Sequence, residues 1–76
     1  MKTGITILTF AIRLRRMDKL PKLILMVMRL GGDLLFISAA DCRITLSIKA
    51  HSKNAHMFEP QLARIVDVLD IIKLGG

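Results

Sequence analysis

The segment from Leu20 to Leu30, LPKLILMVMRL, is almost wholly apolar, and it restricts the fold more than any other part of the chain. Its only charged residues are Lys22 and Arg29, which lie within about 20° of each other on a helix, so such a helix has one narrow polar line. A helix that spans a bilayer needs roughly 20 apolar residues, whereas Gly31 and Gly32 end this one much earlier. The segment therefore predicts a helix that is covered mostly by protein, with no contact to a membrane.

The sides of this helix are expected to have different neighbours. Leu20, Ile24 and Val27 lie opposite the polar line and are predicted to face the sheet of their own domain. The chain has 76 residues and is 53% hydrophobic, and a core of that size is too small to cover the remaining apolar flanks as well. We predict that the flanks form an interface in a homodimer, with Leu23, Leu25, Met28 and Leu30 as the candidate residues.

Three segments have the apolar patterns that are typical of strands. Gly4–Leu14 alternates two sets of side chains, and Leu34–Ala40 and Arg43–Ala50 follow the helix. Asp41 and Cys42 separate the last two segments and predict a tight hairpin. In the first strand, one face is expected to carry Leu8, Phe10, Ile12 and Leu14, and the other Ile5, Ile7, Thr9 and Ala11.

The last third of the chain predicts one more helix and one more strand. The polar residues 51–56 are expected to be a loop, followed by a helix from about residue 57 or 58 to 66 with Pro60 in its first turn. Residues 68–74 read as a short final strand. The order β-α-β-β-α-β predicts an α+β, ferredoxin-like fold, with two helices on one face of an antiparallel four-stranded sheet, in a single domain of residues 1–76.

The residues that could carry chemistry are few and scattered. Cys42 is the only cysteine, which excludes an internal disulfide and predicts a reducing, cytoplasmic location without a secretory signal. The spacing of Cys42, His51 and His56 matches no zinc-binding pattern. No nucleophile, acid and base are grouped, so neither a metal site nor catalytic activity is expected.

The formal charge of +6 is concentrated early in the chain. A basic run of this kind is either a solvated loop or a site for an anion or an acidic partner. A nucleic acid is not expected as a partner, because the third strand lacks the aromatic side chains on which RNA bases stack. The run consists of Arg13, Arg15, Arg16, Lys19 and Lys22 around a single Asp18.

The first loop and helix, MDKLPKLILMVMRLGGDLLFIS, resemble the start of an ACT domain, a small amino-acid-sensing module. Leu20 matches the Leu that enters the first helix of that family, Gly31 the Gly that ends it, and Leu34 the start of the next strand. Leu23, Ile24 and Val27 match the apolar helix positions.

The segment FEPQLARIVDVLDIIKL resembles the last helix and strand of the small regulatory subunit of acetolactate synthase (acetohydroxyacid synthase). Gln61-Leu62 and Val66-Asp67-Val68 carry this likeness, which is greatest to the short form of the second bacterial isozyme. The resemblance covers the chain from about Ile7 to Leu74.

The resemblance implies a non-catalytic subunit that binds the large, thiamine-diphosphate-dependent catalytic subunit and activates it in branched-chain amino-acid biosynthesis. It implies a homodimer, a cytoplasmic location and no cofactor on this chain. Candidate contact surfaces are the basic loop and the strand face with Ile5, Ile7, Thr9 and Ala11. Two alternatives are a stand-alone amino-acid-sensing ACT module and a basic RNA-binding ferredoxin-like protein.

The resemblance also places a candidate effector-binding loop, for a branched-chain amino acid, at Arg16, Met17, Asp18, Lys19 and Leu20. Valine-sensing members of the family have an Asn and then a Pro-Gly here, where backbone amides approach the effector. In this chain Asp18 stands in place of the Gly, and its charge repels an amino-acid carboxylate unless the neighbouring cations offset it. Feedback binding of valine is therefore expected to be weak or absent.

Overall fold

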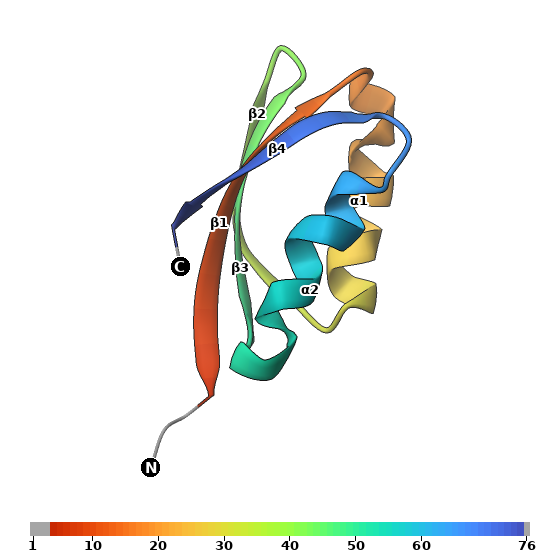
Figure 1. Cartoon of the computed structure of the whole chain (residues 1–76). Coiled ribbons are helices and arrows are strands. Elements are labelled where there is room, and N and C mark those ends of the chain that lie inside the picture. Colours follow the sequence, from red (N-terminus) through yellow and green to blue (C-terminus); the bar gives the residue numbers. More distant parts are fainter. Residues whose placement is uncertain (1–3, 76) are drawn as a thin grey trace.

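The helices lie together on one side of a single sheet in the computed structural model, which describes residues 4–75 (Figure 1). The predicted ferredoxin-like α+β fold and its order of elements are confirmed, while residues 1–3 and 76 of the predicted domain lie outside the described residues. The elements are strand β1 (Ile5–Leu14), a 3₁₀ turn η1 (Met17–Lys19), helix α1 (Leu20–Arg29), strands β2 (Asp33–Ala40) and β3 (Arg43–His51), helix α2 (Ser52–Ala63) and strand β4 (Val68–Gly75).

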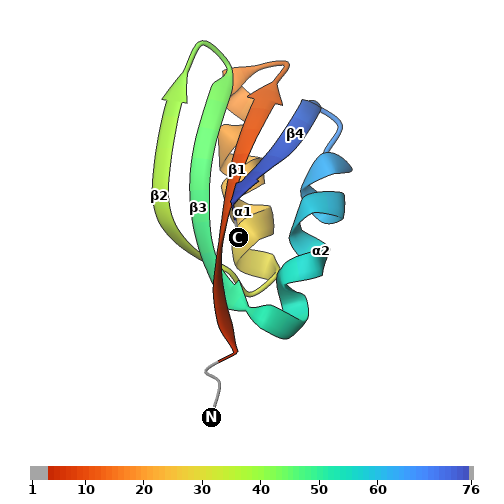
Figure 2. The ribbon, with the colours of Figure 1, turned by 60° about the vertical axis from the view of Figure 1, so that its left-hand side comes forward.

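The strands stand side by side in the order β2-β3-β1-β4, and each neighbouring pair is antiparallel (Figure 2). The central strands β1 and β3 pair from Ile5 opposite His51 to Arg13 opposite Arg43. α1 packs beside the edge strand β2, whereas α2 packs mainly against the other edge strand, β4. The loop between β1 and α1 and the connection between α2 and β4 lie at the same end of the sheet, where the Arg15 N–H donates to the Asp67 carbonyl (Figure 1).

The core lies between the sheet and the two helices. The predicted alternation in β1 is confirmed, because Leu8, Phe10, Ile12 and Leu14 are all buried on the helix side. Strand β3 alternates in the same way. The two helices and the turn after α2 close the core from the other side, with Leu23, Val27, Phe58, Leu62 and Ile65.

The orientation of α1 differs from the prediction. Leu23, which was predicted to lie at the dimer interface, is 0% exposed and belongs to the core. Ile24, predicted to face the sheet, is only half-buried. The prediction assumed that the core lies directly opposite the polar line, but α1 is covered by α2 as well as by the sheet. Met26 and Lys22 line the surface between α1 and α2. The buried side of α1 therefore faces a direction between α2 and the sheet, and not the sheet alone.

Two consecutive glycines end α1 for two different reasons. Gly31 has φ +86°, and its N–H donates to the Met28 carbonyl, while the Gly32 N–H donates to the Val27 carbonyl. These two bonds define a Schellman cap, which favours glycine at the first position. At Gly32 the reason is space, because an added Cβ would lie 2.6 Å from Ile48 Cγ2 and 2.8 Å from Phe58 Cε2.

The second helix begins earlier than predicted, and the expected polar loop does not form. α2 starts at Ser52, directly after β3, and the Ser52 N–H donates to the carbonyl of Gly4 across 2.6 Å. Ala55, one turn before the buried Phe58, packs against the core. Pro60 consequently lies inside the helix and not in its first turn. The predicted start was too late because proline was assumed to mark the first turn of a helix. Tertiary packing here overrides that local preference.

Asp41 and Cys42 form the predicted tight turn between β2 and β3. Both have positive φ, 52° and 66°, which is the backbone of a two-residue type I′ hairpin. Neither residue is a glycine, so the turn adopts its shape against a steric preference. Cys42 is half-buried, and its carbonyl accepts a hydrogen bond from the Leu14 N–H.

Candidate functional site

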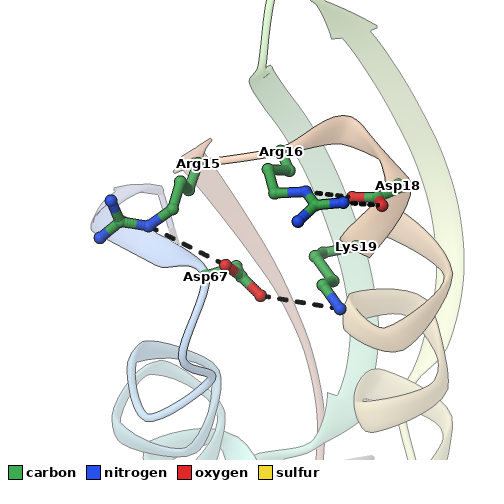
Figure 3. A network of polar contacts seen from close by, with 5 residues as sticks. All are labelled: Arg15, Arg16, Asp18, Lys19 and Asp67. Atoms are coloured by element: carbon green, nitrogen blue, oxygen red, sulfur yellow. Dashed lines mark hydrogen bonds and ion pairs between the residues drawn. The ribbon is translucent and has the colours of Figure 1, made fainter.

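The candidate effector-binding loop carries an ion pair within itself (Figure 3). Arg16 Nε donates to Asp18 Oδ1 at 3.2 Å and Arg16 Nη2 to Asp18 Oδ2 at 2.8 Å, a bidentate pairing. The carboxylate of Asp18 is therefore occupied by its neighbour. Asp18 does not cap the first helix, since α1 begins at Leu20 and no side chain caps it.

Asp67, directly before β4, lies beside this loop, and this position was not predicted from the sequence. Its side chain is only 18% exposed and lies 3.9 Å from Arg15 Nε and 4.0 Å from Lys19 Nζ (Figure 3). Its backbone carbonyl accepts a 2.7 Å hydrogen bond from the Arg15 N–H. The topology could have indicated this neighbour, because antiparallel pairing of β1 and β4 brings the end of one strand to the start of the other.

These contacts divide the five candidate effector-binding residues into two groups. Arg16, Asp18 and Lys19 lie at the surface, whereas Met17 and Leu20 pack against the hydrophobic core. Arg15, Arg16 and Lys19 face two carboxylates, so the charge excess of the cluster is one. An incoming carboxylate would have to compete with Asp18 or Asp67 for these cations, in a solvated setting where each pair is worth at most about 1 kcal/mol.

The exposed side of α1 presents a second candidate surface. Met28 is 61% and Leu25 47% exposed, and Leu30 is half-buried against the core. Met26 faces α2, so Met28, on the other side of the buried arc, lies toward the edge strand β2. Leu35, an exposed residue of β2, lies where the register shifts between Leu34 and Phe36 and is not part of the regular pairing with β3. We call Leu25, Met28 and Leu35 the α1–β2 surface.

A third surface is the side of the sheet that no helix covers, which we call the outer sheet face. At its centre the Thr9 and Ser47 hydroxyls lie 3.0 Å apart and share a hydrogen bond. Ile7 is 52% exposed, although it belongs to the same strand as the buried core residues. The register places these side chains on the outer sheet face: Ile5, Ile7, Thr9, Ala11 and Arg13 of β1, Phe36 and Ser38 of β2, Arg43, Thr45, Ser47 and Lys49 of β3, and Asp70 and Ile72 of β4.

Chemistry-bearing side chains are not assembled elsewhere in the described residues. Within residues 4–75, no three His, Cys, Asp or Glu side chains come close enough to hold a metal ion together. In the same range, neither helix has the length and apolar character needed to cross a membrane. The candidate binding surfaces are therefore the α1–β2 surface, the outer sheet face and the charged loop, which consists of residues 15–19 together with Asp67.

No protein-family model matches the chain, and no curated protein matches its sequence. The fold class, ferredoxin-like α+β, follows from the order of elements and of strands alone.

Proposed function

We propose that this protein is a non-catalytic, ACT-like regulatory subunit that activates the large catalytic subunit of acetolactate synthase in the cytoplasm. The proposal rests on the sequence resemblance, and the βαββαβ order is compatible with it. The structural observation that carries it is the amount of exposed apolar surface. Eleven large apolar side chains are exposed among the described residues, and contiguous patches of such residues typically mark a contact with another protein.

The first proposed contact is with a second copy of the chain, through the α1–β2 surface. β2 is an edge strand, and after Asp33 its sequence LLFISAA has no charge and no proline. Edge strands without such residues tend to pair with another chain unless something covers them. The register shift lies at the Asp33 end, so the strand is regular from Phe36 onward. A two-fold dimer that joins two β2 edges would also bury Met28.

Exchanging an exposed apolar side chain of this surface for a charge tests the dimer. Met28→Glu is expected to shift the protein from dimer to monomer in light scattering, because burying an unpaired carboxylate is unfavourable. Met57→Glu on α2 is the matched control, since Met57 is an exposed methionine on the other helix and should leave the dimer intact. A dimer that survives Met28→Glu unchanged would refute the interface. Leu23→Glu is unsuitable, because Leu23 is buried in the core.

The proposed mechanism is a shift in the conformational equilibrium of the catalytic subunit. A subunit without catalytic groups can raise the activity of its partner only if it binds the active conformation more tightly than the inactive one. Thiamine-diphosphate chemistry would remain entirely with the partner.

The candidate effector is a branched-chain amino acid at the charged loop, and valine control is expected to be weak. Asp18 is held by Arg16, and Asp67 lies between Arg15 and Lys19, so an effector carboxylate meets cations that already have partners.

The deciding experiment mixes the purified chain with the large subunit and measures acetolactate formation, with and without valine. We expect stimulation that valine hardly changes. No stimulation at saturating chain would refute the proposal. Tight binding of an amino acid by the isolated chain in calorimetry would favour the stand-alone sensing module, and retention of single-stranded RNA at physiological salt would favour the RNA-binding alternative.

A further inference from the structure

One end of the outer sheet face has two guanidinium groups side by side. Arg13 of β1 lies directly opposite Arg43 of β3, and Asp70 of β4 lies on the other side of Arg13. Asp70 Oδ2 accepts a 2.7 Å hydrogen bond from Arg13 Nη2, whereas Arg43 forms no ion pair within residues 4–75. Like charges directly opposite each other on neighbouring strands are destabilising. Arg43 is therefore a cation that the described chain leaves unpaired beside another cation.

Two shallow hollows flank Arg43 on this face. The first lies toward β4, with Ala11, Thr45 and Ile72 beside the two arginines and Asp70. The second lies toward β2 and is lined by Ser38, Ala40, Asp41, Arg43 and Thr45. The small side chains of these hollows leave Arg43 accessible from both sides. The first hollow has two arginines against Asp70, a formal charge of +1, whereas in the second Arg43 is offset by Asp41, so the first hollow is the more favourable one for an anion.

The remainder of the outer sheet face is mostly uncharged. Next to the arginine pair come the rows of Ala11 with Thr45 and of Thr9 with Ser47. The exposed Phe36 lies opposite Ser47 in the second row, and the exposed Ile7 lies beyond it. This arrangement combines a guanidinium with a broad area of hydroxyl and apolar side chains that is mostly uncharged. A free carboxylate or phosphate would cover only the charged end. A nucleic-acid backbone needs cations spread along its path, and here they gather at one end, with Lys49 opposite Asp33 at the other.

We infer that the outer sheet face docks a partner protein whose contact surface carries an acidic side chain beside aliphatic ones. The acidic side chain enters the first hollow and pairs with Arg43, and the aliphatic side chains cover Ala11, Ile72 and Ile7. Guanidinium and carboxylate pair in a bidentate geometry, which fixes the orientation of the two proteins. The inference rests on the proposed function, since it assigns this face to the catalytic subunit and leaves the α1–β2 surface to the second copy of the chain.

The test measures the affinity of the large subunit for the intact chain and for charge-reversed variants, by calorimetry or biolayer interferometry. Arg43→Glu turns a like-charge pair with Arg13 into an opposite-charge pair, so its thermal midpoint should equal or exceed that of the wild type. Any loss of binding then cannot be attributed to unfolding. Arg64→Glu at the end of α2 makes the same change of charge on the opposite side of the domain and is the matched control.

We expect Arg43→Glu to weaken binding at least tenfold and Arg43→Lys to weaken it less, while Arg64→Glu binds like the wild type. Equal binding by wild type and Arg43→Glu would overturn the inference and leave the proposed function intact. Equal weakening by both glutamate variants would also overturn it, because only the total charge would then matter. If the wild type neither binds nor stimulates the large subunit, the proposed function and this inference fail together. RNA retention that Arg43→Glu abolishes would replace the protein partner with a nucleic acid.

Discussion

The two faces of the sheet are built from similar residues but have different environments. On β1, Leu8 and Ile7 are neighbours in sequence and similar in size, yet Leu8 is 2% exposed and Ile7 52%. The helices cover only the side that carries Leu8 (Figure 1). The covered face accounts for stability, whereas the outer sheet face keeps apolar side chains that the domain itself does not bury. Hydrophobicity of a strand residue therefore does not by itself distinguish a core position from a binding position.

The largest difference between the two faces is expected when Leu8 and Ile7 are each replaced by alanine. Leu8→Ala removes buried methyl groups and leaves a cavity, so the free energy of unfolding should fall by about 2–5 kcal/mol. Ile7→Ala should change it by at most about 1 kcal/mol, because its side chain is already half in water. Urea unfolding of both variants, at concentrations where the protein is monomeric, measures the difference. Equal losses would mean that both faces are buried and would remove the contrast.

Replacing the proline within α2 should stabilise the helix that covers the inner face of the sheet. Pro60 lies inside α2, is exposed, and cannot donate a backbone hydrogen bond there. Pro60→Ala is expected to raise the free energy of unfolding by up to about 3 kcal/mol, since proline is that much less favourable than alanine within a helix. Thermal unfolding provides the measurement, and Glu59→Ala at the preceding exposed position should have little effect. A lower midpoint for Pro60→Ala would show that the helix does not continue through this residue.

The spacing between helices and sheet can be tested at the two glycines after α1. Gly32→Ala should destabilise by about 1–3 kcal/mol, because its Cβ would meet Ile48 and Phe58 at less than 3 Å. Gly31→Ala has open space and only an unfavourable φ, so its loss should be nearer 1 kcal/mol. Chemical denaturation of the two variants measures which of them loses more free energy of unfolding. The reverse ranking would mean that the layers can separate locally at no great cost.

The smallest expected effect concerns the turn that joins β2 and β3. Cys42→Gly removes a side chain from a residue with φ 66°, and relief of this strain exceeds the added backbone entropy by about 0.5 kcal/mol. The thermal midpoint should rise by about 2–4 °C, whereas Cys42→Ser, which keeps the same backbone preference, should not raise it. Binding through the outer sheet face should not change. A gain in stability with Cys42→Ser would point to the thiol and not to the backbone.

Features that depend on local pattern could be predicted correctly from the sequence. Alternation in β1 and β3, the hairpin at Asp41 and Cys42, and the end of α1 at Gly31 each follow from period and steric preference. The prediction was wrong where two distant segments meet. Leu23 is in the core because α2 covers one side of α1, and α2 starts at Ser52 because β3 leads directly into it.

The candidate sites divide in the same way. The exposed residues Ile5 and Ile7 of the outer sheet face could be predicted, because a strand's period of two separates them from the core. The charged loop could be predicted only in part, since Asp67 reaches Arg15 and Lys19 through pairing of β1 with β4. The juxtaposition of Arg13, Arg43 and Asp70 likewise depends on the register of three strands.

The sequence by itself determined the elements, their order and which residues of each strand share a face, because these follow from backbone geometry and short-range patterns of apolar residues. Only the tertiary structure decided how far α1 turned, where α2 began, and which charges met. Those outcomes depend on contacts between residues that are tens of positions apart, and the packing of one helix changes what its neighbours can bury.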